Sequence, residues 1–367
     1  MTMMDALLNR AAQRNTPAAG TFELTARCNL SCRMCYIHNL SCDKELSKDE
    51  LSTAQWIDIM DQIQTAGTLP LLLTGGEPLI RPDFPEIYQE AVKRGFLLSI
   101  NTNGTLLSEE HFKLFARQKP LRTNISIYGM CPETYESLCG NGAAFEKVIS
   151  NIRHLRELGV TVKINFSSTS YNHKDIPKVL EFAREVGSIV HFVSYMFPPT
   201  RAAKPCEEPF KRYTPLEAAE AGIDWIRLSN SPEQFAAECR KHATMPPGRI
   251  DECLYEGKEG ARCRAGRCSY WITYKGDLLP CGMIPAIHAS VPELGFRAAW
   301  DQVGGQFRSI SMPKGCLSCP DYERCEVCPA IAWAENEDFS QVPKYICEKN
   351  HHYHTRLAAL GAEGSDL

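Results

Sequence analysis

Residues 21–36 read TFELTARCNLSCRMCY, a predicted strand that runs directly into a cysteine-rich loop. The first six residues have the apolar and β-branched composition of a buried strand. The loop then places Cys28, Cys32 and Cys35 in a C-x3-C-x2-C pattern. Because the chain is large and shows no export signal, metal ligation explains this cluster better than disulfide bonding does.

Strands and helices alternate from this first strand onward, which predicts parallel strands joined by right-handed crossovers. Six such units are fewer than a closed eight-stranded barrel needs, so the sequence predicts an α/β fold with an open, partial (β/α)6 barrel. The predicted strands are 21–26, 69–76, 96–104, 121–129, 160–169 and 188–197, and the predicted helices are 47–67, 83–95, 108–118, 143–159, 174–187, 214–230 and 231–242.

Polar and glycine-rich segments follow several of these strands. The second strand ends in TGGEPL at 74–79, the third in NTNG at 101–104, and the fourth carries Ser126 near its end. Function in parallel sheets gathers at the carboxyl ends of the strands. We therefore expect these groups and the three cysteines to surround one small polar ligand.

Charge and hydropathy exclude several classes of protein. The net charge is -4, which gives no overall attraction to nucleic acid or to an anionic membrane. No apolar run approaches the roughly 18–20 residues that a membrane span requires, and the N-terminus lacks the apolar centre of a signal peptide. We expect a cytoplasmic protein that binds neither nucleic acid nor membrane.

The chain holds 17 cysteines, and they are unevenly distributed. Four lie at 28–42 and nine at 253–347. The scattered ones are expected to behave as small buried hydrophobic residues; they are Cys131, Cys139, Cys206 and Cys239.

The C-x3-C-x2-C loop after the first strand, together with Gly75-Gly76-Glu77-Pro78 after the second, resembles the radical S-adenosylmethionine (SAM) superfamily. The resemblance implies that Cys28, Cys32 and Cys35 bind three irons of a [4Fe–4S] cluster and that SAM chelates the fourth. Three thiols leave one coordination position open, as a catalytic metal centre requires. The alternative is a zinc site completed by His38 or Cys42.

The same resemblance implies which residues contact SAM. The GGEP segment would meet the methionine amino group through its backbone, and Ser126 and Asn103 would supply polar contacts. Tyr36, after the third cysteine, would place its backbone against adenine. Met34 departs from the usual aromatic residue, and Tyr128 stands where many relatives carry an acid.

The C-terminal cysteines resemble the SPASM extension of some radical SAM enzymes. The pattern includes Gly276, with a hairpin turn at Gly276-Asp277, and one spacing before Cys328 is x2 in place of x3. The resemblance implies two auxiliary [4Fe–4S] clusters, three clusters in all, with Cys253 as a spare thiol; two zinc sites are the alternative. The implied ligands are Cys263, Cys268, Cys281 and Cys328 for the first, and Cys316, Cys319, Cys325 and Cys347 for the second.

These assignments divide the chain into a core and a small cysteine-rich iron–sulfur domain. The expected division is an N-terminal segment at 1–20, the radical SAM core at 21–230, a linker at 231–250, the SPASM domain at 251–350 and a tail at 351–367.

The resemblance implies reductive cleavage of SAM and then oxidation or crosslinking of a peptide or protein side chain, with flavodoxin or ferredoxin as electron donor. The 1–20 segment is too short for a leader-binding domain, so we expect a separate recognition protein or a short substrate. Gly282 replaces the aspartate of sulfatase-maturating relatives, which argues against that activity. A small-molecule substrate such as a sugar and a non-catalytic scaffold are the alternatives. No catalytic acid or base is assigned; the candidates are Tyr128, His191, Tyr195 and His288.

Overall fold

The computed structural model describes residues 2–37, 46–201, 212–244 and 263–362, and within them one curved sheet of nine strands forms the centre. Its strand order is β6-β5-β4-β3-β2-β1-β7-β8-β9, and neighbours from β6 to β7 are parallel. This confirms the α/β partial barrel. The strands are β1 Ala19–Glu23, β2 Pro70–Thr74, β3 Leu97–Thr102, β4 Arg122–Ile127, β5 Val162–Ser167, β6 Ile189–Val193, β7 Ser269–Ile272, β8 Asp277–Leu279 and β9 Ala289–Ser290.

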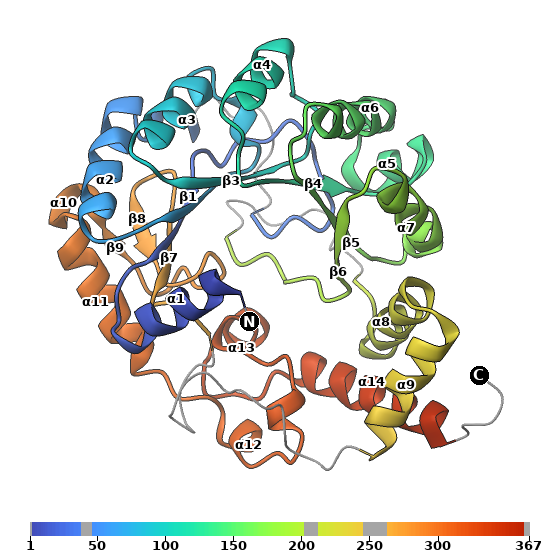
Figure 1. Ribbon diagram of the computed structural model, residues 1–367. Coiled ribbons are helices and arrows are strands. Elements are labelled where there is room, and N and C mark those ends of the chain that lie inside the picture. Colours follow the sequence, from blue (N-terminus) through green and yellow to red (C-terminus); the bar gives the residue numbers. More distant parts are fainter. Residues whose placement is uncertain (1, 38–45, 202–211, 245–262, 363–367) are drawn as a thin grey trace.

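Helices line the outside of the arc that β1 to β6 form, and its inner side faces the chain segments at the centre of Figure 1. The α-helices are α1 Met3–Gln13, α2 Thr53–Thr65, α3 Phe84–Lys93, α4 Glu109–Arg117, α5 Pro132–Cys139, α6 Ala144–Glu157, α7 Ile176–Glu185, α8 Pro215–Ser229, α9 Pro232–Thr244, α10 Val291–Leu294, α11 Phe296–Arg308, α12 Lys314–Leu317, α13 Pro329–Asn336 and α14 Lys344–Ala362. Four short 3-10 helices are η1 Leu46–Asp49, η2 Pro78–Ile80, η3 His173–Asp175 and η4 Tyr322–Arg324.

Helix α2 begins later than the sequence predicts. Ser52 and Gln55 form a capping box in which each side chain accepts a hydrogen bond from the other residue's backbone. This cap starts the α-helix at Thr53, whereas residues 46–49 form the 3-10 helix η1. Helix α5, with Pro132 at its first position, lies between two predicted elements and was not predicted.

The two faces of the parallel sheet differ in chemistry. Alternate strand residues such as Phe22 and Ile125 are fully buried beneath the helices, and the Phe22 ring lies 4.6 Å from that of Trp56 in α2. Because side chains alternate along a strand, the residues between them face the inside of the barrel. There the strands carry mainly polar side chains, so this inner surface is where a ligand can be bound.

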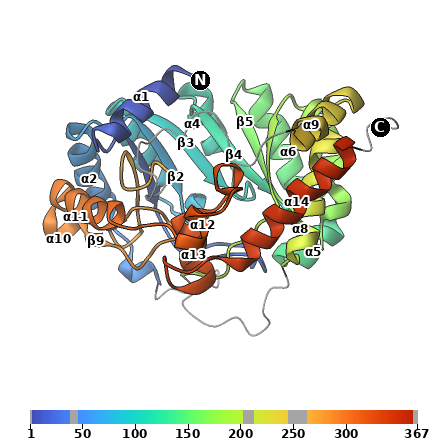
Figure 2. The ribbon, with the colours of Figure 1, turned by 90° about the horizontal axis from the view of Figure 1, so that it is seen from below.

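The cysteine-rich region continues the barrel sheet. Strand β7 pairs in parallel with β1, and β7 and β8 form the predicted hairpin, in which Gly276 has a φ of +90°. Helix α9 occupies most of the predicted linker at 231–250, and α14 extends through residue 362 into the predicted tail. These two helices pack together through Phe235, Cys239 and Leu357, and both lie beside α8 (Figure 2).

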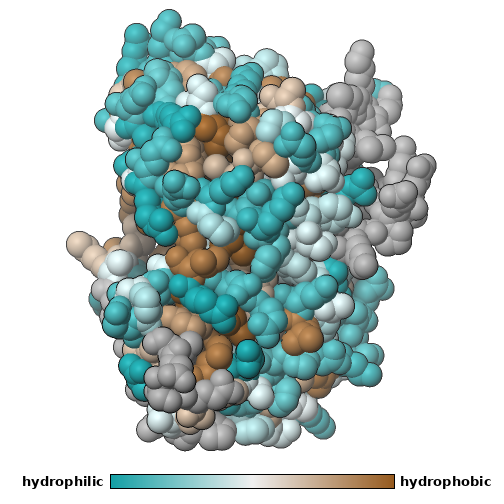
Figure 3. Space-filling view, turned by 90° about the vertical axis from the view of Figure 1, so that its right-hand side faces the viewer, coloured by the Kyte–Doolittle hydropathy of each residue, from teal (hydrophilic) through white to brown (hydrophobic). Residues whose placement is uncertain are grey.

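Within the described ranges, none of the helices combines the length and apolarity needed to cross a membrane. Figure 3 shows the face at the right of Figure 1, where hydrophilic residues predominate and many hydrophobic ones lie in recesses between them.

Candidate active site

A cavity of about 210 Å³ lies at the carboxyl ends of several barrel strands. Loops that follow β1 and β2 form one side of it, and residues at the ends of β4 and β5 form another. Seven of the predicted site residues line it together: Cys28, Cys32, Cys35, Tyr36, Gly75, Gly76 and Ser126. Glu77, Pro78 and Asn103 are not part of the lining.

The end of α5 holds the cysteine loop in place. The backbone N–H of Ser31 donates to the carbonyl of Cys139 (3.1 Å), and that of Arg33 donates to the carbonyl of Leu138 (2.9 Å). These carbonyls belong to the last turn of a helix, where they lack partners within the helix. The unpredicted helix α5 therefore orients the loop, and Cys139, expected to be only a buried hydrophobic residue, contributes to this contact.

Two cysteine thiols of the loop, those of Cys28 and Cys32, have raised pKa values. Burial raises the pKa of Cys28 to about 12, and the pKa of Cys32 also lies well above its usual range, chiefly through a hydrogen bond with Cys139 and then through burial. A bound metal cation reverses this preference, since it stabilises the thiolate directly.

In the part of the chain that the structure describes, no three His, Cys, Asp or Glu side chains converge tightly enough to hold a metal ion as they stand. Three thiols on one cavity wall are nevertheless the donor set that an iron–sulfur cluster uses. The set fits such a cluster if the side chains converge when it binds. His38, Cys42, Cys206 and Cys253 lie outside the described residues.

The glycines of the GGEP segment are required by contact with the cysteine loop. A Cβ atom on Gly76 would lie 2.3 Å from the carbonyl oxygen of Arg27, and one on Gly75 would lie 2.6 Å from that of Thr25. The N–H groups of Gly76 and Glu77 donate to the carbonyls of Thr25 and Arg27. The close approach therefore joins the two loops to each other, and Gly75 and Gly76 still border the cavity.

Glu77 and Asn103 tie the loops together from behind the cavity. Glu77 is fully buried, and its carboxylate accepts hydrogen bonds from Thr102 Oγ1, Asn103 N and Leu79 N. Burial raises the pKa of Glu77 to about 7 despite these bonds. The Asn103 amide donates to Asn29 Oδ1 (2.9 Å) and approaches Cys28 Sγ at 3.7 Å. These side chains position the cysteine loop in this structure.

A buried ion pair that the sequence did not reveal lies beside Tyr36. Arg201 donates two hydrogen bonds of 2.6 Å to the fully buried Glu23, and Trp271 Nε1 donates a third at 2.8 Å. The backbone N–H of Arg201 donates to the carbonyl of Tyr36. Burial, followed by the charge of Glu23, raises the pKa of Tyr36 above its ordinary range. The pair joins strands β1 and β7 to the cysteine loop.

The four candidate acid–base residues lie in different places. Tyr128 lines the cavity, whereas Tyr195 donates to Glu335 (2.6 Å). His288 is exposed and contacts the carbonyl of Pro285, and His191 lies on β6. Of these four, only Tyr128 lines the cavity.

The second predicted set of C-terminal cysteines lines one small cavity. This cavity measures about 50 Å³, and its other walls are mostly apolar. Asn350 of α14 donates to Cys325 Sγ at 2.9 Å. All four members of the set are in the lining: Cys316, Cys319, Cys325 and Cys347.

The first predicted set is less completely assembled. Burial raises the pKa of Cys263 to about 12 even though a backbone hydrogen bond from Ala265 lowers it. The charges of Cys328 and Cys281 raise it further, so these three thiols are neighbours. Cys268 is fully buried, and burial raises its pKa to about 11, with Arg264 as the charge that acts on it. In this structure Cys268 thus stands apart from the other three.

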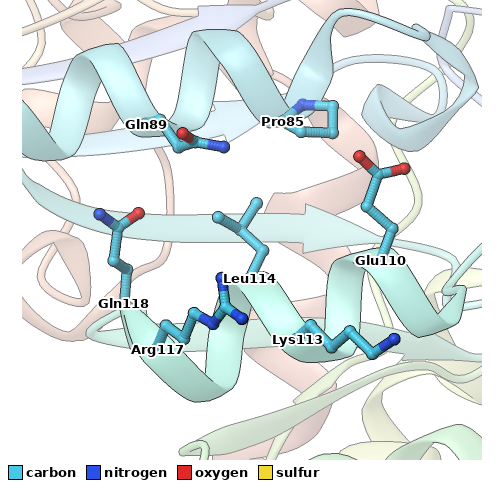
Figure 4. Close-up of a pocket in the computed structure, with 7 residues that line it drawn as sticks. All are labelled: Pro85, Gln89, Glu110, Lys113, Leu114, Arg117 and Gln118. Atoms are coloured by element: carbon cyan, nitrogen blue, oxygen red, sulfur yellow. The ribbon is translucent and has the colours of Figure 1, made fainter.

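A larger groove lies outside the barrel, between α3 and α4 (Figure 4). Pro85 and Gln89 of α3 face Glu110, Lys113 and Arg117 of α4 across it. The groove holds no cysteine and lies in the helix layer, away from the strand ends. We therefore assign the chemistry to the cysteine-lined cavity.

The family model described as the radical SAM superfamily matches residues 22–198. These residues form a radical SAM domain. It is 28% identical to an AdoMet-dependent heme synthase of Methanosarcina barkeri, over 91% of this chain and 97% of that protein. It is 26% identical to a PqqA peptide cyclase of Granulibacter bethesdensis, over 93% of this chain and 90% of that protein.

Two solved structures share the fold of this chain over more than nine-tenths of its length. Streptococcus suis SuiB bound to S-adenosylmethionine superposes with a TM-score of 0.67 at 19% identity, over 93% of this chain and 81% of that one. AdoMet-bound anSMEcpe gives a TM-score of 0.69 at 15% identity, over 95% and 96% of the two chains. The radical SAM domain at 22–198 implies the use of SAM and a [4Fe–4S] cluster.

Proposed function

We propose that this radical SAM protein oxidises or crosslinks a side chain of a peptide or protein. The observation that carries the proposal is the cavity in which Cys28, Cys32 and Cys35 meet Gly75, Gly76 and the end of β4. Support also comes from relatives whose names describe a peptide cyclase and a complex of SuiB with its precursor peptide SuiA.

In this proposal Cys28, Cys32 and Cys35 hold the cluster, and Tyr36, Gly75, Gly76 and Ser126 border SAM. Glu77, Pro78 and Asn103 position the loops that carry these contacts. The two C-terminal cysteine sets hold auxiliary clusters. In the first set, Cys268 has to approach the other three thiols when the cluster binds. When bound, SAM and its cluster supply a 5′-deoxyadenosyl radical that removes one hydrogen atom, and auxiliary clusters supply an acceptor for a second electron. A flavodoxin or ferredoxin supplies the first electron.

The surroundings of Gly282 support a reaction other than sulfatase maturation. A Cβ atom at this position would lie 2.9 Å from the Trp271 indole, and that indole is fixed by its hydrogen bond to Glu23. An aspartate would have to displace the ring and break this bond. The wall that relatives use for a base is therefore closed here by an aromatic side chain.

A small-molecule reaction is the second candidate. The observation that favours it is the 28% identity to a heme synthase over 97% of that protein's length. Both candidates use the same cavity and differ in what enters it.

The test supplies short peptides encoded beside the gene to anaerobically reconstituted enzyme with SAM and dithionite. We expect one peptide to lose two hydrogens, with one 5′-deoxyadenosine formed for each product molecule. Inert peptides together with turnover of a tetrapyrrole or sugar would overturn the peptide assignment. If no 5′-deoxyadenosine is released, the result would favour the alternative that the protein is a non-catalytic scaffold.

A further inference from the structure

Three nitrogen-bearing side chains lie on the inner face of the barrel, two of them near the start of β4 and β5 and the third in the middle of β6. Ser126 and Ser167 line the candidate cavity from the ends of β4 and β5. Residues two and four positions earlier on a strand share its face, so Arg122, Lys163 and their neighbours point to the same inner side. His191 of β6 pairs with Asn165 of β5 and lies on that side too.

The charges that Arg122, Lys163 and His191 exert on one another are positive. Burial and then the charge of Arg122 lower the pKa of Lys163. Burial followed by Lys163 and Arg122 lowers the pKa of His191, which favours a neutral imidazole. Neighbouring cations repel each other in a partly buried place, and a bound anion would relieve this repulsion.

Polar atoms beside these side chains are buried without hydrogen-bond partners. They include Arg122 Nε, and also the side-chain oxygens of Asn124 and Asn165. Asn124 is 4% exposed, and its amide nitrogen donates a hydrogen bond to Asn101 on the neighbouring strand. This hydrogen bond fixes the orientation of the Asn124 amide group and therefore of its oxygen. Burying unpaired polar atoms costs free energy, so donors and acceptors left unpaired on an inner barrel surface indicate a polar ligand.

We propose that Arg122 and Lys163 bind a carboxylate of the substrate, while Asn124 and Asn165 accept hydrogen bonds from its N–H groups. The inference rests on the proposed function, because the ligand is the substrate, which would extend from the candidate cavity along the inner face of β4 and β5. Four residues along a strand separate Arg122 from Ser126, a rise of about 13 Å. An extended peptide covers this distance in about four residues. For a peptide whose modified side chain lies beside Ser126, we therefore infer an acidic residue about four positions away from it.

The experiment measures acetylation of Lys163 in the reconstituted holoenzyme by mass spectrometry, with glutarate, glutaramide or inorganic phosphate as the probe. We expect glutarate to protect Lys163 and uncharged glutaramide to leave it reactive. Arg122→Gln should raise the glutarate concentration needed for protection at least tenfold. The matched control Arg117→Gln, in the outer groove of Figure 4, should leave protection unchanged.

Equal protection by glutaramide, no protection by glutarate, or protection insensitive to Arg122→Gln would overturn the inference. Protection of Lys163 by phosphate but not by glutarate would overturn the proposal of a carboxylate ligand. It would instead indicate that Arg122 and Lys163 bind a phosphate-bearing ligand. Release of 5′-deoxyadenosine by the wild-type enzyme tests the proposed function separately, because protection of Lys163 does not depend on SAM cleavage.

Discussion

The barrel cavity and the C-terminal cysteine region differ in how their cysteines are brought together. Cys28, Cys32 and Cys35 share one loop, which two neighbouring loops and helix α5 fix by backbone hydrogen bonds. The eight C-terminal cysteines are spread from residue 263 to residue 347 and come from a hairpin, several turns and α14. The comparison teaches that one loop after a strand can hold three cysteines close together by local contacts. Cysteines from distant segments come together only when the whole domain has folded.

The frame of the barrel cavity depends on the buried Glu23–Arg201 pair, and breaking it gives the largest expected change in stability. Arg201→Met leaves a fully buried carboxylate without its cation, which costs about 3–5 kcal/mol of unfolding free energy. The matched control Arg153→Met breaks an exposed pair with Glu185 and should cost less than about 1 kcal/mol. Equal effects in urea denaturation would contradict the burial of the Glu23–Arg201 pair.

Glu77 provides a pH test of the same wall. Its pKa in the folded protein is raised to about 7 from an ordinary 4.5, so the protonated form favours folding. This contribution is fully present below pH 4.5 and is lost as the pH rises through 7, an effect on the order of 3 kcal/mol. Glu77→Gln should flatten the pH dependence of the melting temperature over this range. An unchanged slope would show that Glu77 is not buried as described.

Gly76 tests the contact between the two cavity loops. Gly76→Ala places a Cβ against the Arg27 carbonyl, and we expect it to destabilise the protein by about 1–3 kcal/mol and to weaken SAM binding. The control Gly305→Ala adds a Cβ in open space on α11 and should stabilise it slightly. Calorimetry of both variants, with SAM titrated into each, makes the comparison. Two similar results would remove the proposed reason for glycine at position 76.

Asn350 gives the smallest expected effect and examines the C-terminal region. Asn350→Ala removes the hydrogen bond to Cys325 Sγ. If Cys325 binds an auxiliary cluster as proposed, the reduction potential of that cluster should become more negative while the iron content stays the same. Potentiometric titration followed by electron paramagnetic resonance measures this shift. A shift in the potential of the SAM-binding cluster instead would contradict the assignment of Cys325 to the C-terminal region.

The sequence predicted which segments meet at the barrel cavity, because the signals for these segments are local. Strand residues 21–26, the cysteine spacing and the glycines at 75 and 76 each describe a segment whose position follows from parallel topology. The hairpin at Gly276 was likewise a local turn signal. Strand ends and the start of α2 were misplaced by a few residues, because caps such as Ser52–Gln55 compete with similar nearby patterns.

Contacts between distant segments could not be predicted. Glu23 and Arg201 are 178 residues apart, and Trp271 reaches them only because β7 adds to the edge of the barrel sheet beside β1. No periodicity in the sequence encodes that pairing. In the sequence, Trp271 looks like any other strand residue, two positions before the turn at Thr273–Gly276. Its contact with Gly282 could be found only from the structure.

The most direct test of the account compares release of 5′-deoxyadenosine by two triple variants, each reconstituted anaerobically with iron and given SAM and dithionite. Both Cys28/Cys32/Cys35→Ala and Cys316/Cys319/Cys325→Ala should fall from about twelve to about eight irons per chain. We expect the first variant to release no 5′-deoxyadenosine above background and the second to retain release. Release by the first variant, or its loss in the second alone, would contradict the assignment of the barrel cavity as the site of SAM cleavage.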